Sequence, residues 1–134
     1  MKFFFRKRFF TVLLLLVAIV TLSNSCSNSL EDKLKAYSRG MNAECPITID
    51  EYTRLDGTQI VGENILRMNY TITQNFPVMD TVLLKQGMKD INVNMLKNKQ
   101  NEFVTDNDVT VQYYYHDSSN NYLFSVEVNA ADYK

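Results

Sequence analysis

Tryptophan is absent from this chain of 134 residues, and histidine occurs only once, as His116. Cysteine occurs twice, as Cys26 and Cys45. A structural zinc site takes four ligands, so cysteine and histidine are too few here to build one. The chain also lacks a glycine-rich phosphate loop and a nucleophile-elbow motif. These absences argue against an enzyme of a recognisable class, and we predict no metal, no cofactor and no catalytic residue.

Three groups of residues offer weaker signals of chemistry, and each is better explained by an ordinary structural role. Cys45 falls at a predicted helix C-terminus, where the helix dipole opposes a thiolate, so a catalytic pair of Cys45 and His116 is disfavoured. Four carboxylates lie close together in the sequence, as Asp50, Glu51, Asp56 and Glu63. Nothing marks one of them as buried, as a general acid would be. The run 106–108 alternates carboxylates but lacks the glycine and the distal glutamate of a calcium loop, which favours a solvated turn.

The first 25 residues have the three parts of a secretory signal peptide. Four positive charges open the segment, on Lys2, Arg6, Lys7 and Arg8. An apolar run follows at residues 9–22, and small polar residues come after it. The run is shorter than the roughly 20 residues that a membrane-spanning helix needs. An uncleaved membrane anchor is therefore the weaker interpretation.

The end of this segment, Leu22-Ser23-Asn24-Ser25-Cys26, resembles the lipobox of bacterial lipoproteins, in which small residues precede an obligatory cysteine. The resemblance implies that residues 1–25 are removed, that the Cys26 thiol carries a diacylglyceryl group and that the new amino terminus is acylated. Two or more acyl chains hold a protein stably at a membrane. Ser27, in place of an aspartate, implies sorting to the outer membrane, on its periplasmic leaflet or at the cell surface. The alternative is an ordinary secretory signal with an incidental cysteine.

Removal of residues 1–25 leaves 109 residues, enough for one small domain. We predict a short tether at 26–29 and a single domain at 30–134. Ten basic and 15 acidic side chains remain, a net charge of −5, and no basic cluster is present. Nucleic acid is therefore an improbable partner. Lipidation of Cys26 leaves Cys45 unable to form an intramolecular disulfide.

Residues 30–45 have the periodicity of a helix. Ser29 suits the N-cap, and acidic residues follow in the first turn, where the helix dipole favours them. One apolar stripe comprises Leu30, Leu34, Tyr37, Met41 and Cys45. Pro46 ends the helix at Cys45 or slightly earlier.

A first hairpin is predicted between residues 47 and 73. The segment 47–61 reads as an extended lead-in, a bulge or bend near Asp56-Gly57, and a strand. The loop is Gly62-Glu63-Asn64, and a turn at Asp56-Gly57 is the alternative register. The second strand alternates apolar and polar residues, with Leu66, Met68, Tyr70 and Ile72 in the apolar phase.

A second helix and a second hairpin complete the chain. Phe76-Pro77 breaks the preceding strand, and Asp80 suits a helix cap. The helix stripe comprises Leu84, Met88, Ile91 and Met95, broadened by Leu83 and Leu96. Strands at 109–115 and 122–128 flank a polar loop at 117–121. We therefore predict an α+β fold in the order α-β-β-α-β-β, with a four-stranded antiparallel sheet of two hairpins and both helices on one face.

Short segments of the domain resemble those of a group of small exported bacterial domains to which no activity is assigned. These segments are Asn42-Ala43-Glu44-Cys45-Pro46, Asp50, Thr53-Arg54-Leu55-Asp56 and Tyr113-Tyr114-Tyr115. The resemblance covers about residues 30–130. It implies the same α+β layout and nothing about mechanism.

Tyrosine provides the candidate binding residues. The alternation puts four tyrosines in the core phase, Tyr70, Tyr113, Tyr115 and Tyr122. Tyr114 falls on the opposite face with Arg67, Asn69 and Gln112, a combination that suits a binding surface for a protein or a glycan. A merely solvated tyrosine is the alternative interpretation. We predict a lipid-anchored, non-catalytic envelope module that binds a protein or glycan partner through its open sheet face or an edge strand, with a small envelope hydrolase as the alternative function.

Overall fold

The computed structural model describes residues 29–73 and 81–134, and the account below concerns these residues. The predicted signal peptide, Cys26, the Phe76-Pro77 break and the Asp80 cap lie outside the described residues. None of the described helices is both long and apolar enough to cross a membrane. The described chain has five strands and four α-helices, with one short 3-10 helix. The prediction of an α+β fold is confirmed.

The strands form one mixed sheet in the order β1-β2-β3-β4-β5. Their bounds are β1 Ile47–Thr48, β2 Thr53–Gly62, β3 Ile65–Ile72, β4 Thr110–Asp117 and β5 Tyr122–Val128. Neighbours pair antiparallel except β3 and β4, which run parallel with Ile65 opposite Thr110. The prediction of a four-stranded, wholly antiparallel sheet is therefore wrong. The long connection between β3 and β4 returns the chain to the end where β3 began, as parallel pairing requires.

The first hairpin has the register that the sequence favoured. β2 and β3 are joined through a turn at residues 63–64, and Asp56-Gly57 forms a bulge within β2 where the pairing with β3 shifts. The alternative turn at Asp56-Gly57 is wrong. The extended lead-in is itself a strand, β1, which pairs with the start of β2 and adds the fifth strand.

Helix α2, Leu30–Glu44, begins at Ser29, whose side chain accepts a hydrogen bond from the backbone N–H of Asp32 as predicted. It packs over β2, and Leu34 is fully buried. Ser38 faces the sheet one turn later, and its hydroxyl lies 2.7 Å from the hydroxyl of Thr58. This polar contact fixes the helix against β2 beside the apolar stripe.

Helix α3, Thr81–Leu96, packs against β5 with a face that overlaps the predicted stripe only in part, and Leu96 of that stripe is buried. Leu84 and Met88 pack against the core as expected, but Ile91 is 54% exposed and Leu83 and Met95 are also exposed. Asn92 takes the inward position instead, because its amide donates a hydrogen bond to the Tyr115 hydroxyl at 3.4 Å. A polar residue thus faces the sheet where a tyrosine hydroxyl provides its partner.

Three short helices were not predicted. The 3-10 helix Lys99–Asn101 and α4, Glu102–Asp106, lie between α3 and β4, and α5, Ala130–Tyr133, follows β5. Tyr37 of α2 stacks on Phe103 of α4, with 4.8 Å between ring centroids. The Tyr133 hydroxyl donates to the carbonyl of Val109 at 2.9 Å. These contacts close one end of the domain.

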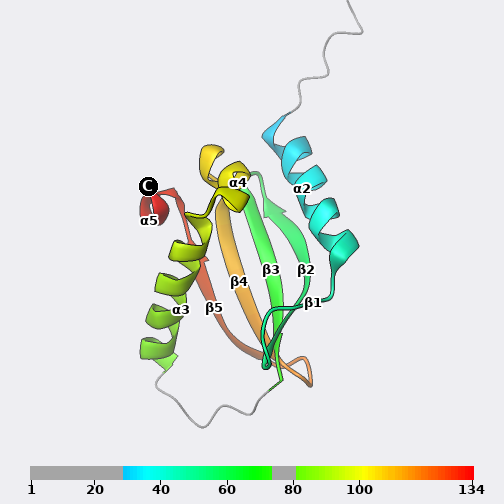
Figure 1. Cartoon of the computed structure of the whole chain (residues 1–134), viewed down its shortest axis with the longest axis vertical. Helices are drawn as coiled ribbons and strands as arrows, with labels where there is room; N and C mark the ends of the chain where they lie inside the picture. The colour runs from blue at the N-terminus through cyan, green and yellow to red at the C-terminus, as the bar shows by residue number, and fades with distance from the viewer. Residues whose placement is uncertain (1–28, 74–80) are drawn as a thin grey trace, which may run out of the picture.

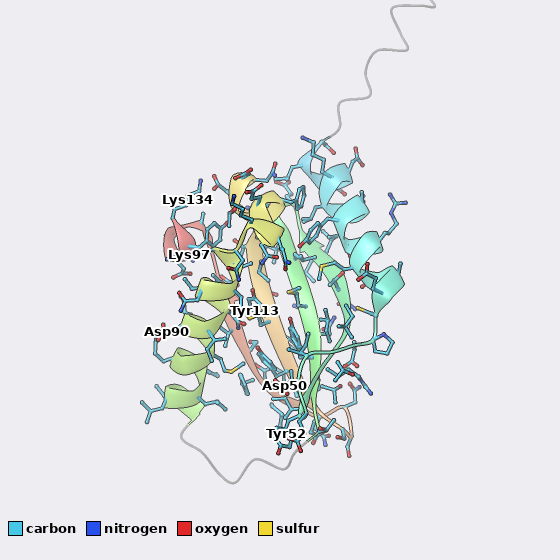
Figure 2. All side chains as sticks on the ribbon, viewed as in Figure 1. Asp50, Tyr52, Asp90, Lys97, Tyr113 and Lys134 are labelled. Carbon is cyan, nitrogen blue, oxygen red and sulfur yellow. The ribbon has the colours of Figure 1, made fainter. Side chains whose placement is uncertain are left out.

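The helices lie on one face of the sheet, as predicted. In Figure 1, α2 (blue to cyan) runs along the β2 side, α3 (green) along the β5 side, and α4 (yellow) over one end. The core beneath them contains the apolar phase of each strand, with Leu66, Tyr70, Val111, Tyr113, Tyr115, Phe124 and Val128 all buried. Tyr113 lies in the middle of the sheet, between the two long helices (Figure 2).

Candidate functional site

The side chains of the opposite phase form what we call the open face, which the described helices do not pack against. Its central members come from β3, β4 and β5, and are Arg67, Asn69, Thr71, Gln112, Tyr114, His116, Ser125 and Glu127. Cross-strand pairing orders them in rows, because residues opposite each other on neighbouring strands share one face. One row runs Asn69, Tyr114, Ser125, and the next runs Arg67, Gln112, Glu127.

The four residues predicted from the sequence come together on this face. Arg67 places its guanidinium carbon 4.7 Å from the centroid of the Tyr114 ring, a cation–π contact. The same guanidinium donates two hydrogen bonds to the Gln112 side-chain oxygen, at 3.2 and 3.3 Å. Asn69 lies directly opposite Tyr114 on the neighbouring strand. The guanidinium of Arg67 is thereby held over the Tyr114 ring.

Gln112 relays the contact to β5. Its side-chain amide donates to the carboxylate of Glu127 at 3.0 Å. The chain of partners Arg67, Gln112 and Glu127 therefore crosses three strands and brings a positive and a negative charge to the two ends of one row. Such a network fixes rotamers that would otherwise be free, which prepares the surface for binding.

His116 and Tyr122 join Tyr114 to form the aromatic cluster, a group that the sequence reasoning missed. The Tyr114 ring lies 4.7 Å from Tyr122 and 5.1 Å from His116 between centroids. The prediction that Tyr122 belongs to the core is wrong, since it is 51% exposed. The pairing of β4 with β5 shifts between Tyr115 and His116, so that Tyr122 lies opposite His116 and turns to the open face.

Cys45 and His116 lie beside different strands of the sheet, with β3 between these strands. His116 belongs to β4, whereas Cys45 follows α2 beside the β2 edge, two strands away. Cys45 is half-buried rather than buried, and burial raises the pKa of its thiol, with Asp56 and Glu44 acting in the same direction. A raised pKa disfavours the nucleophilic thiolate. The structure therefore does not bring together the pair that the sequence analysis disfavoured.

Among the carboxylates of residues 29–73 and 81–134, none has a raised pKa of the kind that suits a general acid. Those whose pKa is shifted have it lowered: hydrogen bonds do this at Asp50 from the backbone of Tyr52, at Asp117 from Asn121, and at Asp132 from Lys89. Asp56 accepts hydrogen bonds from Arg54 and Thr71. In the described part of the chain, no group of three or more potential metal-ligating side chains is present.

A cavity that the described residues form beneath the helices is too small to serve as a ligand site. Its volume is about 50 Å³, and its lining includes Tyr37, Met68, Tyr113 and Met95. Drug-sized ligands occupy pockets of roughly 300 Å³ or more. Polar and aromatic groups of the described residues converge on the open face instead.

Comparison with known proteins bears on the fold. No protein-family model matches the chain, and no curated protein matches it. The pilotin EpsS of the Vibrio vulnificus type 2 secretion system matches with a TM-score of 0.63 and 13% identity, over 78% of this chain and 92% of its own. The chain shares its fold with a pilotin.

A second solved structure, described as that of a candidate secreted protein of Pseudomonas aeruginosa, has a TM-score of 0.56 and 14% identity. The match covers 78% of this chain and 93% of that protein. Each similarity extends over nearly the whole of the compared protein. This chain, the pilotin and the Pseudomonas aeruginosa protein therefore share one fold. At these identities they do not transfer individual site residues.

Proposed function

We propose that this protein is a lipid-anchored module of the bacterial cell envelope that binds a partner through its open face and performs no catalysis. One observation carries the proposal. Arg67, Gln112 and Tyr114 come from two strands and are locked to one another on the sheet face opposite the helices. Aromatic and arginine side chains held in this way are typical of binding hot spots.

The cellular location rests on the N-terminus and on the comparisons. The signal-like segment and Cys26 support export and acylation, and Ser27 supports the outer membrane, with the domain in the periplasm or at the cell surface. Two proteins with the same fold are described as a candidate secreted protein and a pilotin. Both descriptions agree with an exported domain.

The partner is an envelope protein or a glycan. The pilotin belongs to a type 2 secretion system, which supports a protein component of the envelope as one class. The mixed aromatic and amide surface supports a glycan as the other. The alternative of a small hydrolase has no comparable support, because the carboxylates whose pKa is shifted are all shifted toward the ionised form.

The proposal is tested by comparing two tyrosine variants of the full chain in its native cells. After chemical cross-linking, the tagged protein is purified from the envelope, and the bound protein and carbohydrate are quantified. Tyr114→Ala removes the centre of the cluster. Tyr52→Ala is the matched control, because Tyr52 is an exposed tyrosine in the β1–β2 connection with no ring contact to another described residue.

We expect Tyr114→Ala to lower partner yield about tenfold, the loss typical of a hot-spot residue, and Tyr52→Ala to leave it unchanged. The amount of each variant in the membrane fraction controls for expression and anchoring. Equal yields from the wild type and Tyr114→Ala would remove the open face as the binding surface.

A further inference from the structure

A polar hollow adjoins the open face at the bulge of β2. Its volume is about 320 Å³, within the range of small-molecule sites. Its lining includes Asn42, Cys45, Asp56, Gly57, Gln59 and Asn69. Asn69 belongs both to this lining and to the open face, so the hollow continues the row that contains Tyr114.

Gly57 leaves part of the hollow open, because it has no side chain. Gly57 lies opposite Asn69, and a Cβ at Gly57 would come 3.4 Å from the Asn42 side-chain oxygen, an ordinary contact that fills space without a clash. Asn42 is fixed in place by both backbone groups of Thr58, accepting from its N–H at 2.6 Å and donating to its carbonyl at 3.0 Å. The wall facing Gly57 is therefore rigid.

The hollow presents unused hydrogen-bonding groups. The Gln59 side chain makes no hydrogen bond to any residue that the structure describes, and Asn69 makes only a long one, 3.5 Å, to the Gly57 carbonyl. Each amide offers two donor hydrogens and an acceptor oxygen. Asp56 accepts bonds from Arg54 and Thr71 and so is held at the rim.

Charges around the hollow and the aromatic cluster balance. Asp56 is paired with Arg54 at 2.6 Å, and Arg67 is linked through Gln112 to Glu127. A balanced lining gives little attraction to phosphate or to a polyanion. The complementary ligand is uncharged and rich in hydrogen-bonding groups.

The hollow and the adjoining row match a neutral saccharide chain in length and in chemistry. The row Gly57, Asn69, Tyr114, Ser125 crosses four strands, about 14 Å at the usual strand spacing. Sugar hydroxyls match the free amides of Gln59 and Asn69, and the C–H faces of a sugar ring match the exposed aromatic surface of Tyr122 beside Tyr114. The buried centre of a protein interface is more apolar than the rest of the surface, whereas amide and carboxylate side chains line the hollow, which disfavours a folded protein in the hollow.

We propose that the hollow at Gly57 and the adjoining row of the open face bind an uncharged oligosaccharide, an inference that rests on the proposed binding function and names its ligand class. Amides in the hollow hold the hydroxyls of one sugar unit. The aromatic cluster stacks against a later unit of the same chain.

The test is an NMR titration of the full chain in micelles of a detergent without a sugar headgroup. The probes are maltotriose, cellotriose and tri-N-acetylchitotriose, added separately. The observed signals are the backbone amide of Gly57 and the side-chain amides of Gln59 and Asn69. Two variants target the hollow, Gly57→Ala and Gln59→Ala. The control for Gly57→Ala is Gly87→Ala on the exposed side of α3, where a Cβ would meet open space. The control for Gln59→Ala is Gln86→Ala on the same helix.

We expect at least one trisaccharide to give saturable shifts at these three residues. Gln59→Ala removes one hydrogen-bonding group and should weaken binding about fivefold or more. Gly57→Ala fills space that the sugar would occupy and should weaken binding by a similar factor, and the controls should not weaken it. No described glycine has a positive φ, so Gly57→Ala should fold normally. Binding by none of the three sugars, or binding that Gly57→Ala leaves unchanged, would overturn the inference.

The sugar titration and the partner-capture experiment can fail independently, so the saccharide assignment and the proposed function are tested separately. If Tyr114→Ala abolishes capture of an envelope protein while no sugar binds, the open face is a protein-binding surface and only the saccharide assignment is wrong. If sugars bind at Gly57 while partner capture does not depend on Tyr114, the hollow stands without the proposed function.

Discussion

Two adjacent tyrosines on β4 should respond in opposite ways to truncation. Tyr113 is 3% exposed, packs in the core and lies 6.2 Å from the Tyr70 ring between centroids. Removal of such a large buried ring costs about 3 to 5 kcal/mol. Tyr114 is partly exposed on the other side of the same strand, and its loss removes surface contacts with Arg67, His116 and Tyr122 that are worth about 1 kcal/mol together.

Urea unfolding followed by circular dichroism measures both effects. With an m-value of about 1 to 3 kcal/mol per molar urea, Tyr113→Ala should lower the midpoint by at least about 1 M. Tyr114→Ala should lower it by no more than about a third of the Tyr113→Ala shift, and Tyr114→Phe less still, because the ring contacts remain. If Tyr114→Ala unfolds the protein as readily as Tyr113→Ala, Tyr114 is a core residue and the open face does not exist as described.

Three further predictions concern the anchor, the β2 edge and the C-terminal helix. Cys26→Ala should stall processing or release the protein from the membrane fraction, and mass spectrometry finding an unmodified Cys26 in the native protein would end the lipoprotein interpretation. Asn42→Ala should lower the free energy of unfolding by about 1 to 3 kcal/mol, because it leaves the buried Thr58 backbone N–H without its partner, and an unchanged urea midpoint would refute this role. The hydrogen bond and ion pair with Lys89 lower the pKa of Asp132 in the folded protein. Their contribution to the stability of the fold is therefore complete above about pH 4, and it is lost as the pH falls through the folded-state pKa. In thermal melts, the stability of Asp132→Asn should depend less on pH in this acid range than that of the wild type.

Local alternation predicted the two faces of the sheet well. The runs ending in Ile72 and Tyr115 have strict period-two patterns. Their apolar phases face the core, buried except for the half-buried Met68. The four residues of the other phase share the opposite side, and are Arg67, Asn69, Gln112 and Tyr114. Alternation of this kind is decided by neighbouring residues along one strand, which makes it readable from sequence. The four candidate site residues followed directly from it.

Features that depend on partners distant in sequence were not predicted. Strand pairing between β3 and β4 joins segments 45 residues apart, and nothing local distinguishes parallel from antiparallel pairing there. The inward position of Asn92 depends on the Tyr115 hydroxyl, and the exposure of Tyr122 depends on a shift in pairing with β4. The aromatic cluster was not predicted because simple alternation placed Tyr122 in the core, whereas the shift in pairing turns Tyr122 to the open face. The hollow at Gly57 likewise needed Asn42 of α2, which no strand pattern could bring to the β2 edge.

The central claim is that partners meet the open face, and site-specific photo-cross-linking in living cells tests it most directly. A photoreactive benzoylphenylalanine replaces Ser125, which lies opposite Tyr114 on the open face, or Gln86, which is exposed on α3. We predict ultraviolet-dependent adducts from position 125 that disappear when Tyr114→Ala is combined with it, and none from position 86. Adducts of equal yield from both positions, or from position 86 alone, would contradict the account.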